Sequence, residues 1–120
     1  MSISGQNPKR GEIWDIDLNP TKGQEINKTR PAIVISSDGV GKLRLKIIVP
    51  ITEWQQSFEG NFWHVPIQPT PVNGLTKHSA ADALQVRSLS LERFVNCRGR
   101  ATKQELEEIV QALAAVVEFS

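Results

Sequence analysis

The polar segment from Asn19 to Arg30 contains three side chains that can act on a phosphodiester: Lys22, Glu25 and Arg30. Arg30 offers a planar, permanently charged set of N–H donors that suits phosphate oxygens. Glu25 can carry a proton, and a carboxylate beside an arginine stays ionised, which suits a base better than an acid. Lys22 adds a point charge. For each of the three, the alternative interpretation is a solvated surface side chain.

Two apolar runs flank this segment and must position it. Residues 12–18 alternate apolar and acidic side chains, which indicates a half-buried strand. Residues 32–36 form a short β-branched run that is typical of a buried strand. Pro20 and Pro31 restrict the backbone at the two ends of the long connection, so we expect an ordered loop.

Further strands are expected after an Asp-Gly turn at Asp38. Residues 43–49 alternate, which predicts a strand with one buried face, formed by Leu43, Leu45, Ile47 and Val49, that ends before Pro50. Residues after Pro50 read as a loop or a helical turn up to position 57. The next strands are expected over 62–67 and from Ser79 onward. The segment 90–94 is compatible with a short strand or a helical turn.

An amphipathic helix is expected from about Thr102 to Glu118. Thr102 and Glu105 match the capping box, in which a hydroxyl and a carboxylate each satisfy a free amide at the start of a helix. Apolar side chains then recur at helical spacing. Many short strands with one terminal helix predict a mostly β fold with a C-terminal α-helix, arranged as a small barrel.

Length and composition indicate one globular domain over residues 1–120, with residues 1–10 as a flexible lead-in. The net charge of +1 is uninformative, but residues 1–100 hold 13 Lys and Arg against 9 Asp and Glu, whereas the last 20 are acidic. A polyanion would therefore meet the body of the protein. The opening residues lack an apolar leader and no run is long enough to span a membrane, so we expect a cytoplasmic protein.

Several motifs together carry a resemblance over nearly the whole chain. They are Gly11–Trp14 with Asp17–Glu25, Arg30–Ser36, Val49–Thr52, Gly74–Leu75, Gln85–Ser88 and the final helix. In this order they closely resemble toxins of the MazF/PemK type. The resemblance implies an SH3-like (CcdB/PemK-type) barrel that forms a homodimer, cleaves single-stranded RNA without a metal and is inhibited by a MazE-like antitoxin.

The resemblance also implies roles for individual residues. Arg30 matches the catalytic arginine of the family and Thr52 its catalytic threonine, while Glu25 aligns with an acidic residue that assists in some members. Gln85 and Arg87 resemble a Gln-x-Arg strand that lies near RNA. The alternatives are a turn threonine bonded to its own backbone for Thr52 and strand-surface packing for Gln85 and Arg87.

Aromatic side chains provide a second means of holding single-stranded RNA, because bases stack on them. Trp54 lies in a polar segment two residues after Thr52 and is the candidate for this role, whereas Trp14 is expected in the core and Trp63 is undecided. Together with Lys22, Gln85 and Arg87, Trp54 makes up the expected RNA-binding set.

Histidine and cysteine offer little catalytic chemistry. His64 and His78 have no carboxylate at a telling spacing, so an acid–base pair of histidines is not expected. With so few histidines and the single Cys97, no metal site and no cofactor are expected.

The resulting hypothesis is a sequence-selective, metal-independent endoribonuclease toxin that leaves 2′,3′-cyclic phosphate and 5′-hydroxyl ends. The alternative is a non-catalytic binder on the same fold, either a gyrase poison of the CcdB type or an SH3-like adaptor. The chain ends in Val116–Ser120 without a tryptophan, which counts against the gyrase poison.

Overall fold

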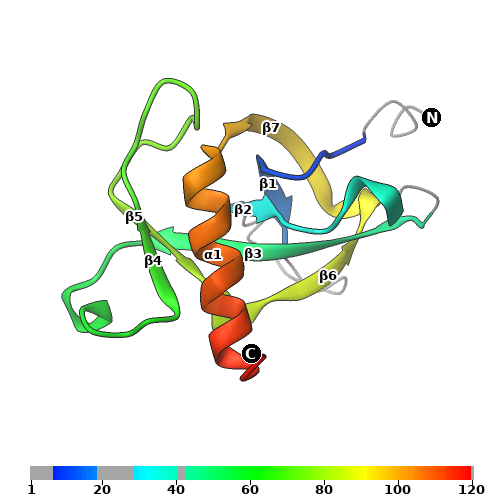
Figure 1. The fold of residues 1–120 in the computed structure, drawn as a ribbon. Helices are drawn as coiled ribbons and strands as arrows, with labels where there is room; N and C mark the ends of the chain where they lie inside the picture. The colour runs from blue at the N-terminus through cyan, green and yellow to red at the C-terminus, as the bar shows by residue number, and fades with distance from the viewer. Residues whose placement is uncertain (1–6, 19–28, 41–42, 120) are drawn as a thin grey trace, which may run out of the picture.

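A computed structural model describes residues 7–18, 29–40 and 43–119. In this part of the chain, seven antiparallel strands precede one helix (Figure 1). The elements are β1 (Glu12–Asp17), β2 (Thr29–Val34), β3 (Leu45–Glu53), β4 (His64–Ile67), β5 (Ser79–Asp82), β6 (Arg87–Ser90), β7 (Phe94–Arg100) and α1 (Lys103–Val116), with 3₁₀ turns at Asp38–Val40, Gln56–Phe58, Ala83–Gln85 and Leu91–Arg93. The expected fold class, mostly β with a C-terminal helix, is confirmed.

The longest strand, β3, organises the sheet. The strand order is β4-β5-β3-β2-β1-β7, and β6 also pairs with β3. On one edge β3 pairs with β2, and on the other it pairs first with β6, over residues 45–48, and then with β5, over residues 51–53. In Figure 1, α1 crosses in front of β3.

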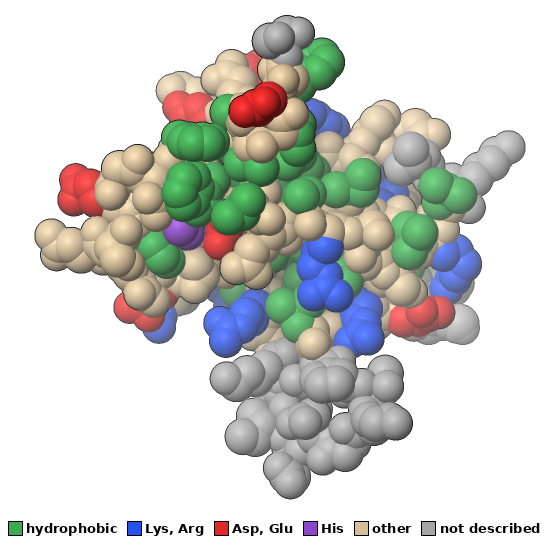
Figure 2. All heavy atoms as spheres, turned by 90° about the horizontal axis from the view of Figure 1, so that it is seen from below, with side chains coloured by type: hydrophobic (Ala, Val, Ile, Leu, Met, Phe, Trp, Pro, Cys, Tyr) green, Lys and Arg blue, Asp and Glu red, His purple; other side chains and the backbone are tan. Residues whose placement is uncertain are grey.

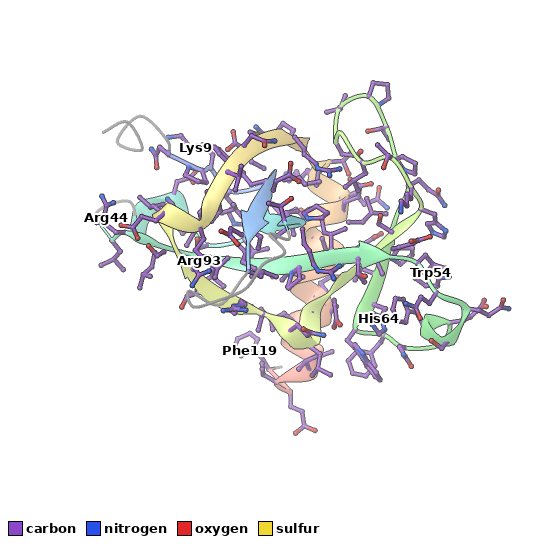
Figure 3. The ribbon with its side chains drawn as sticks, turned by 180° about the vertical axis from the view of Figure 1, so that it is seen from behind. Lys9, Arg44, Trp54, His64, Arg93 and Phe119 are labelled. Carbon is purple, nitrogen blue, oxygen red and sulfur yellow. The ribbon has the colours of Figure 1, made fainter. Side chains whose placement is uncertain are left out.

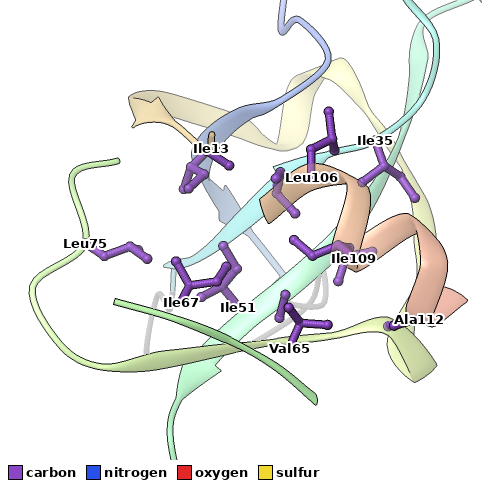
Figure 4. Close-up of a cluster of buried hydrophobic side chains, with 14 residues drawn as sticks. Ile13, Ile35, Ile51, Val65, Ile67, Leu75, Leu106, Ile109 and Ala112 are labelled. Carbon is purple, nitrogen blue, oxygen red and sulfur yellow. The ribbon is translucent and has the colours of Figure 1, made fainter. Parts of the chain in front are cut away.

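One hydrophobic cluster fills the space between the sheet and α1. Its members come from several strands and from α1, and Figure 4 shows their side chains converging. They include Ile13, Ile33, Val49, Ile51, Ile67, Leu106 and Ile109. Burial of apolar side chains stabilises a fold by roughly 1.5–3 kcal/mol each, so this cluster anchors α1 to the sheet.

A second cluster lies on the opposite face of β3. Ile48 belongs to it, together with Trp14, Ile16 and Phe94, and Trp14 meets Phe94 edge-to-face at 5.8 Å between ring centroids. The expectation that Trp14 is a core residue is confirmed. Because both faces of β3 contribute to a cluster, the strand is held from two sides.

The capping box at the start of α1 is confirmed. The Thr102 side chain accepts from the Glu105 amide at 3.0 Å, and the Glu105 carboxylate accepts from the Thr102 amide at 2.9 Å. The helix runs from Lys103 to Val116, slightly shorter than the expected range.

The expectation that pairing stops at Pro50 is wrong. Strand β3 continues to Glu53, and Pro50 lies opposite Ala32 of β2. Since the amide of Ile35 donates to the carbonyl of Ile47, the hydrogen-bonded pairs with β2 fall on odd-numbered residues of β3. The missing N–H of Pro50 would therefore point to the other edge, into the interval between the β6 and β5 partners, where its loss is tolerated.

The expected buried face of residues 43–49 is also wrong at its start. Leu45 and Ile47 are 46% and 43% exposed and Leu43 is exposed, whereas Lys46 is only 3% exposed. On the side of β3 that carries Ile47, the helix covers only the later residues Val49 and Ile51. The opposite side, which carries Lys46, continues into the second cluster at Ile48. Alternation identified the strand, but it could not tell how far each face is covered.

Two other boundaries differ from expectation: the strand expected over 62–67 begins at His64, and β7 was not foreseen. Of the two alternatives for the segment 90–94, the helical turn is confirmed, as the 3₁₀ turn Leu91–Arg93. Within the expected flexible lead-in, the described residues attach to the body: Pro8 is buried, and Arg10 donates to Asp38 and to the carbonyl of Ile35.

Candidate active site

The antiparallel register of β2 and β3 brings Arg30 and Thr52 together. The pairs Ala32–Pro50 and Val34–Ile48 define a register that, extended by two residues, places Arg30 opposite Thr52. By the alternation described above this is a non-hydrogen-bonded position, where opposite side chains come closest. Two residues separated by 22 positions in the sequence therefore share one surface, on the face of β3 away from α1.

Two cavities meet at this pair, and Arg30, Ile51 and Thr52 line both. We call them the Arg98 cavity, of about 400 Å³, and the Arg87 cavity, of about 390 Å³. Both have the volume of a small-ligand pocket. A linear substrate could thus lie across Arg30 and Thr52 with one part on each side.

The Arg98 cavity has a wall of basic side chains from the β4–β5 connection and β7. Lys77 lies 3.4 Å from Glu53, and both side chains are more than 60% exposed. Arg98 makes a shorter ion pair, with its Nε 2.6 Å from Oδ1 of Asp15, and also donates to the carbonyl of Gly74.

Close backbone packing holds the β4–β5 connection against β7. A Cβ at Gly99 would lie 2.0 Å from the carbonyl oxygen of Val72, and one at Gly74 would lie 2.4 Å from the carbonyl oxygen of Arg98. Only glycine fits at these two positions, so the wall that includes Lys77 is fixed to β7.

The Arg87 cavity is lined by a different set of groups. Arg87 begins β6 and Gln85 ends the 3₁₀ turn before it, and both are exposed. Asp82 and His64 face one another across the β4–β5 register. Nε2 of His64 is 3.5 Å from Oδ2 of Asp82, and both side chains are largely buried. Phe58 also lines the cavity and stacks on His64 with a centroid distance of 3.7 Å.

Trp54 lies at the end of β3 in a neighbouring hollow of about 650 Å³, not in either of the two cavities. Its ring stacks on His78 at 5.1 Å and meets Phe58 edge-to-face. Figure 3 shows Trp54 and His64 at the same end of the molecule, far from Lys9 and Arg44. Phe58 and His64 line both this hollow and the Arg87 cavity, so the two adjoin at this stacked pair.

The structure brings four of the expected site residues to one groove: Arg30, Thr52, Gln85 and Arg87. Trp54 borders that groove, and Lys22 and Glu25 lie outside the described residues. Three basic side chains line the two cavities together with Arg30: Arg87 in one, and Lys77 and Arg98 in the other. Figure 2 shows the molecule from below, with several Lys and Arg side chains close together beside hydrophobic ones. This local charge was hidden in the small net charge of the chain.

Sequence reasoning missed the pairing of His64 with Asp82. The two residues are 18 positions apart, and only the β4–β5 register makes them neighbours. A prediction of that hairpin with its register could have found the pair, whereas local spacing could not. Arg98 and Lys77 were missed for the same reason.

The described residues contain no helix that is long and apolar enough to cross a membrane. Over the same residues, no group of three or more His, Cys, Asp or Glu side chains is arranged so that it could hold a metal ion.

A small barrel-like β-sheet closed by a C-terminal helix, with an arginine and a threonine meeting in a basic groove, defines a class of compact proteins suited to binding a polyanion. Residues 9–117 match the family model for the PemK-like, MazF-like toxin of type II toxin-antitoxin systems. The chain belongs to this family.

Individual relatives agree with this assignment. The chain is 32% identical to endoribonuclease MazF9 of Mycobacterium tuberculosis over 111 residues, which cover 88% of this chain and 92% of the relative. It is 29% identical to the probable endoribonuclease MazF5 of the same organism, over 94% of this chain and 95% of the relative. These names favour the nuclease hypothesis over a non-catalytic binder.

Solved structures show the same fold. A MazE–MazF structure from Deinococcus radiodurans superimposes with a TM-score of 0.78 at 23% identity, covering 96% of this chain and 99% of the other. A mycobacterial endoribonuclease in complex with its cognate antitoxin gives a TM-score of 0.74 at 18% identity, covering 94% and 97%.

Proposed function

We propose that this protein is an endoribonuclease toxin that cleaves single-stranded RNA at preferred sequences without a metal ion. The observation that carries the proposal is the cross-strand placement of Arg30 opposite Thr52, where the two cavities meet. Membership of the toxin family and the names of the relatives support it.

The reaction proposed is an internal transesterification. The ribose 2′-oxygen forms a bond to phosphorus, the bond from phosphorus to the 5′-oxygen breaks, and the products are a 2′,3′-cyclic phosphate and a 5′-hydroxyl. The guanidinium of Arg30 and the hydroxyl of Thr52 donate to the phosphate oxygens as negative charge develops on them. One proton leaves the 2′-hydroxyl and one reaches the 5′-oxygen. Glu25 is the candidate carrier, and its role as base or acid stays open.

The groove suggests a path for the RNA strand. With the scissile phosphate at Arg30 and Thr52, flanking nucleotides occupy the Arg98 and Arg87 cavities. Trp54 directly follows β3, two residues after Thr52, and two residues of extended backbone span about 6.6–6.8 Å, which is comparable to one nucleotide step. Trp54 is therefore placed to stack on a neighbouring base, while Lys22, Gln85 and Arg87 contact the strand.

The test is cleavage of a long single-stranded RNA in excess EDTA by the parent protein and by variants at Arg30. We expect discrete fragments from the parent and a loss of about a thousandfold or more in rate for Arg30→Ala. Arg30→Lys keeps the charge without the planar fork and should recover little of the rate. Arg44→Ala removes an exposed arginine that pairs with Glu92 and serves as the matched control.

Two outcomes would contradict the proposal: undiminished cleavage by Arg30→Ala, or parent activity that appears only when magnesium is added. End analysis completes the test, because only the proposed chemistry leaves a 2′,3′-cyclic phosphate. Thermal melts of each variant exclude unfolding as the cause of any loss.

We further propose that the protein is a homodimer. Exposed apolar side chains support this: Leu45 and Ile47 on β3, Leu84 after β5, and Val117 and Phe119 after α1. Exposed apolar side chains mark an interaction site where they gather on one face of a protein. Sedimentation equilibrium should give twice the 13.3 kDa chain mass, and Ile47→Glu should shift it to that of the monomer.

A MazE-like antitoxin is the proposed protein partner, and the cytoplasm the proposed compartment. An extended acidic segment of the antitoxin could lie in the basic groove and compete with RNA. Addition of such a peptide should raise the apparent KM for RNA without changing kcat.

A further inference from the structure

A chain of polar contacts, two of them hydrogen bonds to or from side-chain amides, lies beside the Arg87 cavity. Nδ2 of Asn61 lies 3.2 Å from Nδ1 of His64, Nε2 of His64 lies 3.5 Å from Oδ2 of Asp82, and Nε2 of Gln85 donates to the same oxygen at 3.2 Å. The other oxygen of Asp82 accepts from the amide of Leu84 at 3.1 Å. Both carboxylate oxygens of Asp82 are therefore engaged.

His64 is held in place within this chain and is not poised for proton transfer. With Asn61 donating, Nδ1 of His64 accepts and Nε2 carries the hydrogen that faces Asp82. Phe58 covers one face of the ring. Because both ring nitrogens are engaged and the side chain is only 8% exposed, His64 supports Asp82 and has no nitrogen free for a substrate.

Asp82 in turn determines which way the amide of Gln85 points. An ionised carboxylate can only accept, so the nitrogen of Gln85 must face Asp82. Among the described residues the oxygen of Gln85 has no partner, and the side chain is exposed at the cavity. A free glutamine can rotate its amide and present either atom, whereas this one presents its oxygen.

We propose that Asp82 is a positioning residue that makes Gln85 a reader of one substrate base, selecting a base with an exocyclic amino group. This inference rests on the proposed RNA cleavage. Adenine, cytosine and guanine each have an amino group that can donate to the oxygen of Gln85, next to ring atoms within reach of the donors of Arg87. Both exocyclic groups of uracil are carbonyl oxygens, so a base seated with its exocyclic group at Gln85 would place an acceptor against an acceptor. Uracil would have to shift within the cavity to donate from its single N–H instead.

The first experiment sequences the cleavage ends produced from an RNA pool randomised around the cut. At one position beside the scissile phosphate, the parent should cut uracil about tenfold less than the other three bases, a typical worth of one base contact. Asp82→Asn should reduce that difference to threefold or less, because an asparagine can donate as well as accept and so lets the Gln85 amide turn around. Gln85→Met should do the same without touching a buried group.

Glu92→Gln is the matched control, since it removes one carboxylate that pairs with Arg44 away from the groove. It should leave the base profile unchanged. A base analogue sharpens the test: replacing adenine by purine, which lacks the amino group, should slow the parent about tenfold and leave Asp82→Asn almost unaffected.

A binding measurement separates this inference from the proposed function. Fluorescence anisotropy with short 2′-O-methyl oligonucleotides, which cannot be cleaved by attack of the 2′-oxygen, should show the same preference against uracil in the parent and its loss in Asp82→Asn. If the parent binds with this preference but does not cut RNA, the nuclease proposal fails and the role of Asp82 stands. If the parent has no preference, or if Asp82→Asn and Gln85→Met keep it, the inference is overturned.

Discussion

The two cavities that meet at Arg30 and Thr52 are alike in volume and differ in how their polar groups are held. In the Arg98 cavity the Lys77–Glu53 pair is more than 60% exposed on both sides, whereas in the Arg87 cavity the side chains of His64 and Asp82 are 8% and 12% exposed. Exposed pairs are weak and can exchange partners at little cost, while buried polar networks keep one geometry.

Under the proposed function, the difference gives the two sides different tasks. An exposed ammonium such as that of Lys77 can follow any phosphate, so we propose that the Arg98 cavity contributes affinity that is independent of sequence. A glutamine fixed by a buried carboxylate can distinguish one base edge from another, so we propose that the Arg87 cavity contributes selectivity. In the same proposal, Arg30 and Thr52 act on the phosphate that both cavities help to position.

The largest effect is expected at the position that both cavities share. Thr52→Val keeps the shape of the side chain and removes the hydroxyl, so kcat for RNA cleavage should fall by roughly 10²–10³, the loss expected for one donor to a developing oxyanion. Thr52→Ser restores the donor and should remain within about tenfold of the parent. Equal rates for the parent and the valine variant would show that Thr52 serves only the fold.

The next effect concerns the rigidity of the Arg98 wall. Gly99→Ala would place a methyl group 2.0 Å from the carbonyl oxygen of Val72, so backbone must move, and the free energy of unfolding should fall by about 2–4 kcal/mol. Gly60→Ala is the control: Gly60 also has a positive φ, but its Cβ would meet nothing within 4 Å, so the loss should be nearer 1 kcal/mol. Denaturant melts that give equal losses would contradict the close approach.

A smaller effect separates the cavities directly. Lys77→Ala should weaken binding of all RNA sequences by a similar factor and reduce the slope of log affinity against log salt by about 0.7, the value for one phosphate contact on a single strand. The base profile should stay unchanged. If it shifted at one position, Lys77 would be reading a base, and the contrast between the cavities would be lost.

The smallest effect is expected at the acidic partner of Lys77. Glu53→Gln frees an ammonium that a carboxylate now shares, so RNA affinity should rise by a few-fold at low salt and the gain should disappear as salt screens the charge. The free energy of unfolding should change by less than about 0.5 kcal/mol, because the pair is exposed. A loss of affinity would show that Glu53 holds Lys77 in its binding position.

Local sequence patterns predicted the helices and strands that are determined by residues close together in the sequence. The helix α1 is predicted by its capping box and by the spacing of its apolar residues. The strand β1, which contains Trp14, is predicted by the alternation of apolar and acidic residues. The extent of β3 could not be predicted in this way: Pro50 is tolerated only because a partner strand is missing at that point, and Lys46 is buried because of what covers one face of the sheet.

The same distinction between local and long-range causes applies to the candidate site. Arg30 and Thr52 could be selected from the family resemblance, yet their meeting depends on the register between β2 and β3. The contact between His64 and Asp82 had no local signature, because it joins two strands through side chains that are 18 positions apart in sequence. The absence of a carboxylate near His64 in the sequence was therefore misleading.

Pro50 has a further consequence for the groove. Residues 82–86 pass opposite Pro50, between the end of β5 and the start of β6, and residues 49 and 50 of β3 have no pairing partner on this edge. A residue with an N–H at position 50 could tie this bend to β3 through the main chain and fix it there. With proline the bend is held next to the start of β4 instead, where the amide of Ala83 donates to the carbonyl of Trp63. Side chains near Asp82 could therefore change substrate preference while β2 and β3, which align Arg30 and Thr52, stay unchanged.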